Sequence, residues 1–270
     1  MKLNHIRMNL SLRKHQLEII SLTDIGKRRE SNEDSVASLV INFQNFNKEL
    51  SCGILVVADG MGGLEMGEIA SNLASKKFIE ESVHNILYSS ENNEKINFAE
   101  ILLKSVESAN KEVWKLSEGK IKPIGTTLVG AILIENHIYI VNVGDSRAYL
   151  VKPHKTITQL TEDHTVVQEM LEAKIITKEK AKDHPRRNIL TKALGLAKEV
   201  TPDIIEVEMK DLTLLLCSDG LYSMVNEDEI VMTINGNIYN SAERLISLAN
   251  RYGGLDNISI ALAQVKTPLN

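Results

Sequence analysis

The sequence is poor in cysteine and in aromatic residues, and it has no long apolar run. Its 270 residues include two cysteines, and only 4% are aromatic. Cys52 and Cys217 each lie inside a strand-like apolar segment, which predicts free buried thiols rather than a disulfide or a metal site. No stretch approaches the roughly 18 to 20 apolar residues that span a bilayer, and no signal-peptide core follows Lys2. We therefore expect a cytoplasmic protein that does not cross a membrane.

An excess of basic residues is also lacking. The formal net charge of -5 and the pI near 5.9 argue against a general nucleic-acid binder, which usually carries a basic domain or stripe. The histidines and cysteines show no zinc-binding spacing, and there is no G-x-x-x-x-G-K-[ST] phosphate loop. Hydrophobic residues make up 43% of the chain and the mean hydropathy is -0.11, as in globular enzymes.

The order of hydrophobic patterns predicts an α+β protein. Residues 1–16 show no clear period and are interpreted as an N-terminal extension, which leaves 17–267 as the folded domain. Strands are expected at 17–23, 35–43, 51–58, 126–134, 137–143, 147–151, 156–160, 203–209, 213–218 and 257–265. Helices are expected at about 69–79, 98–116 and 241–251, and a basic, exposed insertion at about 163–192.

Strands in two blocks with helices between and after them favour two antiparallel sheets stacked face to face, with helices outside. The first three strands are expected to form one sheet from hairpins, and the four strands between 126 and 160 a second antiparallel block. The predicted architecture is thus a four-layer αββα sandwich.

Acidic residues stand at the ends of four of these strands: Asp59, Asp145, Asp219 and Asp256. Each one alone could simply form a turn, because Asp-Gly pairs end strands well. If the strand ends meet, however, several carboxylates would repel one another unless a cation lies among them. Carboxylate and carbonyl oxygens suit magnesium or manganese, so the pattern predicts a site for one of these ions.

A further polar cluster precedes the second strand and contains Arg29, Glu33 and Asp34. Neighbouring residues of a strand point to opposite faces, so one of the two acids is expected to ligate and the other to support. The forked guanidinium of Arg29 suits bidentate phosphate binding. The simpler alternative is a surface ion pair between Arg29 and Glu30 or Glu33.

These segments together resemble the metal-dependent protein phosphatases (the PPM family, also called type 2C), in the style of its compact bacterial members. The resemblance covers about residues 18–266 and is highly specific in its order. Its main motifs lie at residues 23–34, 59–63, 67–71, 125–127, 144–147, 160–164, 217–220 and 256–257. It implies a β-sandwich flanked by helices, with 163–192 as a flap beside the site.

The resemblance also implies a metal set of two Mn²⁺ or Mg²⁺ ions per active site. One ion would be bound by Glu33, Asp59 and the Gly60 carbonyl, and the other by Asp59, Asp219 and Asp256. Asp145 together with Asp219 resembles a weaker third site.

The remaining roles follow from the same resemblance. Asp34 resembles a residue that holds metal-bound water, and Arg29 matches the phosphate-binding arginine, so that Arg29, Asp34 and Asp59 are the expected catalytic residues. The implied activity is hydrolysis of phosphoserine and phosphothreonine in proteins by a metal-activated water. Substrates would be targets of a serine/threonine kinase, and we expect a monomer that binds no nucleic acid.

Two positions depart from the family pattern, and two other functions stay open. Met61 stands where many eukaryotic members carry a histidine proposed as the general acid, and Lys174 stands where the flap often has glycine. The alternatives are a non-catalytic binding or regulatory module of the same fold and a phosphomonoesterase for small molecules.

Overall fold

A computed structural model describes residues 16–45, 48–62, 66–91, 96–209 and 212–266. The predicted N-terminal extension, apart from Gln16, lies outside these residues, as do Gly63 of the glycine-rich motif and Thr267. Both cysteines are free and buried, as predicted. None of the helices in the described ranges has the length and apolar character needed to span a bilayer.

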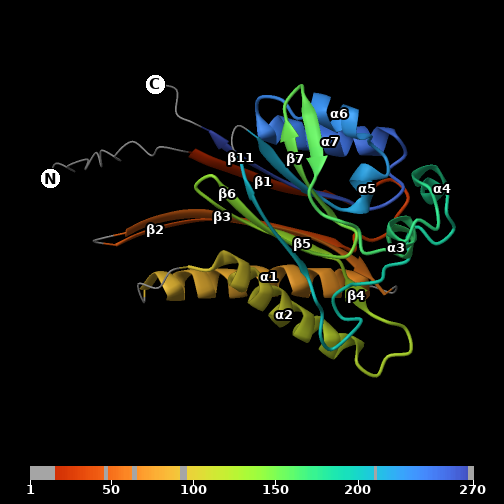
Figure 1. Ribbon diagram of the computed structural model, residues 1–270, viewed down its shortest axis with the longest axis horizontal. Coiled ribbons are helices and arrows are strands. Elements are labelled where there is room, and N and C mark those ends of the chain that lie inside the picture. Colours follow the sequence, from red (N-terminus) through yellow and green to blue (C-terminus); the bar gives the residue numbers. More distant parts are fainter. Residues whose placement is uncertain (1–15, 46–47, 63–65, 92–95, 210–211, 267–270) are drawn as a thin grey trace.

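Two antiparallel sheets form the centre of the molecule (Figure 1). The first has the order β1-β11-β10-β7-β8, with β1 (Gln16–Asp24), β11 (Ile258–Lys266), β10 (Thr213–Cys217), β7 (Arg147–Lys152) and β8 (Thr156–Gln159). The second has the order β2-β3-β5-β6-β9, with β2 (Asp34–Asn45), β3 (Lys48–Met61), β5 (Leu128–Ile134), β6 (His137–Val143) and β9 (Asp203–Glu208). The short strand β4 (Gly125–Thr126) pairs with the end of β3.

Helices cover the outer face of each sheet, which confirms the predicted four layers (Figure 1). On the second sheet lie α1 (Met66–Glu91) and α2 (Phe98–Ser117); on the first lie α5 (Asp219–Tyr222), α6 (Glu227–Thr233) and α7 (Ile238–Arg251). The predicted insertion contains two short helices, α3 (Val166–Glu172) and α4 (Lys178–Lys182), at one end of the sandwich. Outside this insertion, α5 and α6 were not predicted, because each segment is too short to show the helical repeat of apolar residues.

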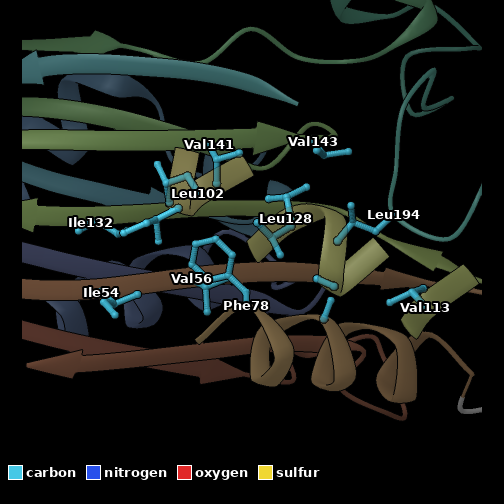
Figure 2. Close-up of a cluster of buried hydrophobic side chains, with 14 of the residues drawn as sticks. Ile54, Val56, Phe78, Leu102, Val113, Leu128, Ile132, Val141, Val143 and Leu194 are labelled. Atoms are coloured by element: carbon cyan, nitrogen blue, oxygen red, sulfur yellow. The ribbon is translucent and has the colours of Figure 1, made fainter. Parts of the chain in front are cut away.

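Three apolar clusters hold the layers together, and they explain the unbroken apolar runs of the central strands. Ile54 and Val56 point toward α1 and α2, where Phe78 and Leu102 pack against them (Figure 2). The alternate residues Leu55 and Val57 point into the cluster between the sheets. A strand buried on both faces needs no polar alternation, and each fully buried side chain of this size stabilises the fold by about 1.5–3 kcal/mol.

The assignment of strands to sheets differs from the prediction. The strand β1 does not join β2 and β3, but pairs with β11 from the far end of the chain. The predicted second block is also divided, because β5 and β6 extend the sheet of β3, whereas β7 and β8 lie next to β10. Local patterns define a strand but not its partner, which long-range packing selects.

This topology gathers the acidic strand ends. Asp34 and Asp59 are register partners at the start of β2 and near the end of β3. In the other sheet, Cys217 at the end of β10 pairs with Arg147 on one side and Ile260 on the other. The residues just beyond these ends, Asp145, Asp219 and Asp256, therefore border a common groove.

Candidate functional site

The backbone of Asp59 is fixed by two neighbouring threonines. Its N–H donates to Thr127 Oγ1 (2.9 Å), and its carbonyl accepts from Thr127 N (2.8 Å) and from Thr126 Oγ1 (2.9 Å). The Thr127 hydroxyl also hydrogen-bonds to that of Ser146, which follows Asp145 (2.7 Å). The chain segments that carry Asp59 and Asp145 are thus joined by buried hydroxyl groups.

Asp34 links the two sheets. Its carboxylate is buried, and Oδ2 accepts a hydrogen bond from Ser218 Oγ (2.7 Å), the residue before Asp219. Ser218 Oγ in turn accepts from the backbone N–H of Ser259 in β11 (3.0 Å). The carboxylate of Asp34 therefore fixes the end of β10 relative to β2, across 184 residues of sequence.

Glu33 lies on a different side of the chain from Asp34, against two glycines. Its carbonyl accepts from Gly60 N (3.0 Å) and from Ser71 Oγ (2.6 Å), and its N–H donates to Asn257 Oδ1 (2.8 Å). A Cβ on Gly67 would stand 2.8 Å from Glu33 Oε1, and a Cβ on Gly60 would stand 2.1 Å from the Gly67 carbonyl oxygen. Only glycine allows this approach, which brings the Glu33 carboxylate close to the Gly60 backbone.

Arg29 makes an ion pair, but not with the partners that the simpler prediction named. Its Nη2 donates to Asp256 Oδ2 at 2.6 Å, and the two side chains are 49% and 31% exposed. An ion pair with Glu30 or Glu33 was thus the wrong expectation. The loop that carries Arg29 is held by Asn257, whose Nδ2 donates to the carbonyls of Ile25 (2.9 Å) and Ser31 (3.0 Å).

The carboxylates influence one another strongly. Burial, reinforced by the charges of Asp219 and Asp256, raises the pKa of Asp34 to about 7. Burial and the charge of Asp219 raise the pKa of Asp145 to about 7, and burial with the charge of Asp256 raises that of Asp219 to about 6. Burial raises the pKa of Asp59 well above its usual value. Repulsion from four other carboxylates adds to this effect: those of Asp34, Asp219, Asp145 and Asp256. The strand ends therefore form one electrostatic unit.

These residues fit a hard divalent cation. In the described ranges, the side chains as they stand form no group of three or more histidine, cysteine, aspartate or glutamate residues that could hold a metal ion. Asp219 Oδ1 is nevertheless buried and has no hydrogen-bond partner in the described structure, although such an oxygen normally finds one. Repelling carboxylates with a free buried oxygen are suited to Mg²⁺ or Mn²⁺, which take oxygen ligands.

Beside the carboxylates runs a groove of about 780 Å³ between the 163–192 segment and α5. Its lining includes Asp145, Asp219 and Asp256, together with Arg147 and Tyr222. Arg147 lies in the family motif at 144–147, for which no role was predicted, and neither Tyr222 nor Ser218 was predicted as a site residue. Their roles could not be predicted locally, because each also contacts residues of other segments.

The two positions that depart from the family pattern are both defined. Met61 is the last residue of β3 and pairs with Gly125 of β4. Lys174 has a φ of +56°, in the left-handed region that favours glycine.

Comparison with known proteins agrees with the geometry. The protein phosphatase 2C family matches residues 20–181. A serine/threonine phosphatase, stp, of Listeria monocytogenes is 39% identical over 251 residues, which cover 90% of this chain and 93% of that protein. The crystal structure of Stp1 from Staphylococcus aureus is 32% identical, has a TM-score of 0.75 and covers 93% of this chain and 96% of that one.

A second solved structure, the catalytic domain of the phosphatase PstP, is described as a complex with 2 manganese ions. It is 30% identical, with a TM-score of 0.73, over 93% of this chain and 99% of that one. These matches confirm the resemblance and the α+β sandwich that the sequence predicted. The chain belongs to the protein phosphatase 2C family of metal-dependent serine/threonine phosphatases.

Proposed function

We propose that this chain removes phosphate from phosphoserine and phosphothreonine side chains of proteins, with two Mn²⁺ or Mg²⁺ ions bound among its strand-end carboxylates. The observation that carries the proposal is the convergence of Asp34, Asp59, Asp145 and Asp219 from both sheets, with a raised pKa for each. Burial of so many like charges is costly unless cations offset them.

The ligands divide into two groups around Asp59. Glu33, Asp59 and the Gly60 carbonyl would hold one ion, an assignment supported by the close packing of Glu33 and Gly60 against Gly67. Asp219 and Asp256 would hold the other ion together with Asp59, whose pKa responds to both of their charges. A weaker third ion would be held by Asp145 and Asp219, which also interact electrostatically.

The ions, when bound, supply the positive charge that activates water and neutralises the phosphate. The residues of the chain bind the phosphate group and orient the water molecule. Arg29 carries a fork of donors beside Asp256 and is half exposed, so its guanidinium is accessible to the phosphate oxygens of a substrate. Asp34, held by Ser218 across the strand pair from Asp59, orients water at the site. The Met61 thioether has no proton to give, so the proton for the leaving oxygen would come from water or from another residue.

The alternatives are weaker. A non-catalytic module has no need of four acidic side chains kept together at such cost. A phosphatase for small molecules needs no open groove of about 780 Å³ beside the carboxylates. The substrates would be proteins that a serine/threonine kinase has phosphorylated, and we expect the chain to act as a cytoplasmic monomer.

The test is release of phosphate from a phosphothreonine peptide after removal of metal by a chelator. We expect activity on addition of Mn²⁺ or Mg²⁺, little activity in Asp59→Asn, and full activity in Glu107→Gln, an exposed acid on α2. Phosphosugars and nucleotides should be poor substrates. Release from neither peptide nor small molecule with any metal would favour the non-catalytic reading, and preference for a small phosphate ester would favour the phosphomonoesterase.

A further inference from the structure

One arginine that the proposed mechanism does not use connects three parts of the site. Arg147 is the first residue of β7 and lies two residues after Asp145. Its register partner is Cys217, two residues before Asp219. The side chain is 23% exposed and lines the groove described above.

The first contact of Arg147 is with the root of the flap. Nε donates to Asp163 Oδ1 at 2.8 Å and Nη2 donates to Asp163 Oδ2 at 2.7 Å. Two parallel hydrogen bonds fix the orientation of a carboxylate as well as its distance. Asp163 stands where the 163–192 segment leaves the sandwich, so this pair sets the direction in which the segment begins.

The second contact is with the helix that begins at Asp219. The guanidinium carbon lies 3.6 Å from the centre of the Tyr222 ring, a cation–π arrangement. The Tyr222 hydroxyl donates to the carbonyl oxygen of Asp145 at 3.0 Å. A further nitrogen of the guanidinium, Nη1, donates to Tyr149 Oη at 3.0 Å, which holds the arginine against β7.

We infer that Arg147 is a positioning residue that fixes the 163–192 flap relative to the carboxylates at Asp145 and Asp219, and thereby shapes the groove for a protein substrate. The inference rests on the proposed function, because it concerns the part of the substrate beyond the phosphate. Arg147 acts through Asp163 and Tyr222, which both line the groove.

Lysine cannot replace this side chain. An ammonium group has no fork to match both oxygens of Asp163 and no plane to lie on the Tyr222 ring. Arg147→Lys therefore keeps the positive charge but removes the paired hydrogen bonds to Asp163 and the stacking on Tyr222. Arg244→Lys makes the same chemical change at an exposed position on α7 and serves as the matched control.

The experiment measures kcat and KM for a phosphothreonine peptide and for a small aryl phosphate, both with Mn²⁺. In Arg147→Lys we expect kcat/KM for the peptide to fall about tenfold or more, mainly through KM, because misplacement by about 1 Å can cost that much. The aryl phosphate, which does not reach the flap, should lose about threefold at most. Tyr222→Phe keeps the ring under the guanidinium and removes only the hydrogen bond to Asp145, so its peptide loss should be smaller.

Hydrogen exchange gives a readout that does not depend on activity. Amides of residues 164–192 should exchange faster in Arg147→Lys than in Arg244→Lys, with no change in α2. Equal losses on both substrates, an unchanged peptide KM or unchanged exchange in the flap would overturn the inference. If Arg147→Lys does not fold, the same kinetic and hydrogen-exchange measurements are made on Asp163→Asn, which changes the carboxylate that Arg147 binds. A wild type that leaves the peptide untouched would refute the proposed function, while hydrogen exchange would still decide the role of Arg147.

Discussion

Replacing Asp219 by asparagine should make the metal-free protein more stable while preventing its stabilisation by metal. The reason is the charge at this position, whose pKa is raised to about 6 from 3.8, first by burial and then by Asp256. When the pKa of a carboxyl group is higher in the folded state than in the unfolded state, its protonated form stabilises the folded state. This contribution is complete only below the pKa of the unfolded state, near pH 4. As the pH rises through 6, that contribution is lost, because the folded protein must hold the charged form. Asparagine has no such charge at any pH.

The size of the effect follows from the two pKa values. At about 1.4 kcal/mol for each pH unit between them, the charged form costs the fold about 3 kcal/mol at pH 8. At pH 5 the cost is about half of that, since Asp219 is still largely protonated in the folded protein. For a chain of this length the gain at pH 8 corresponds to roughly 5 °C in Tm.

The assay is thermal unfolding followed by circular dichroism with excess chelator, at pH 5 and pH 8, and then with Mn²⁺. Without metal, Asp219→Asn should unfold above the wild type, by a larger margin at pH 8. With Mn²⁺ at 100 times its Kd, the wild type should gain about 2.7 kcal/mol and the variant much less. Glu107→Gln should follow the wild type throughout. A variant that is no more stable at pH 8, or a margin that does not grow with pH, would refute the electrostatic argument.

Three further changes test other parts of the site. Arg29→Ala should lower kcat/KM for a phosphopeptide about 10²-fold, because phosphate loses its arginine contact, while Mn²⁺ binding measured by calorimetry persists; loss of metal binding would contradict this role. Ser218→Ala should lower the free energy of unfolding in urea by about 1–3 kcal/mol, because the buried carboxylate of Asp34 loses a hydrogen-bond donor. An unchanged urea midpoint would show that the two sheets do not need this hydrogen bond. Lys174→Gly should raise the free energy of unfolding by about 1 kcal/mol, because glycine adopts the positive φ of this position without strain. Lys180→Gly, inside α4, should lower it by about 1 kcal/mol. Similar effects of the two substitutions would show that Lys174 is not strained.

Much of the fold was readable from the sequence because it depends on local patterns. Residues 54–58 of β3 and 214–217 of β10 are apolar throughout, and such runs bounded by polar residues predict buried strands. The helical spacing near Phe98 predicted α2 almost to its ends. The acids that close the strands were visible for the same reason, since Asp59, Asp219 and Asp256 each lie within two residues of an apolar segment.

The partners of these residues were decided only by the tertiary structure. Arg29 pairs with Asp256 across 227 residues, and Ser218 reaches Asp34 across 184. Strand β1 joined β11 rather than its neighbours in sequence, which placed the turn before Arg29 beside Asp256. Sequence alone determined which side chains stand at strand ends, because that follows from local hydrophobic period. Which ends meet, and so where the charges gather, was settled by strand pairing and sheet stacking between distant segments.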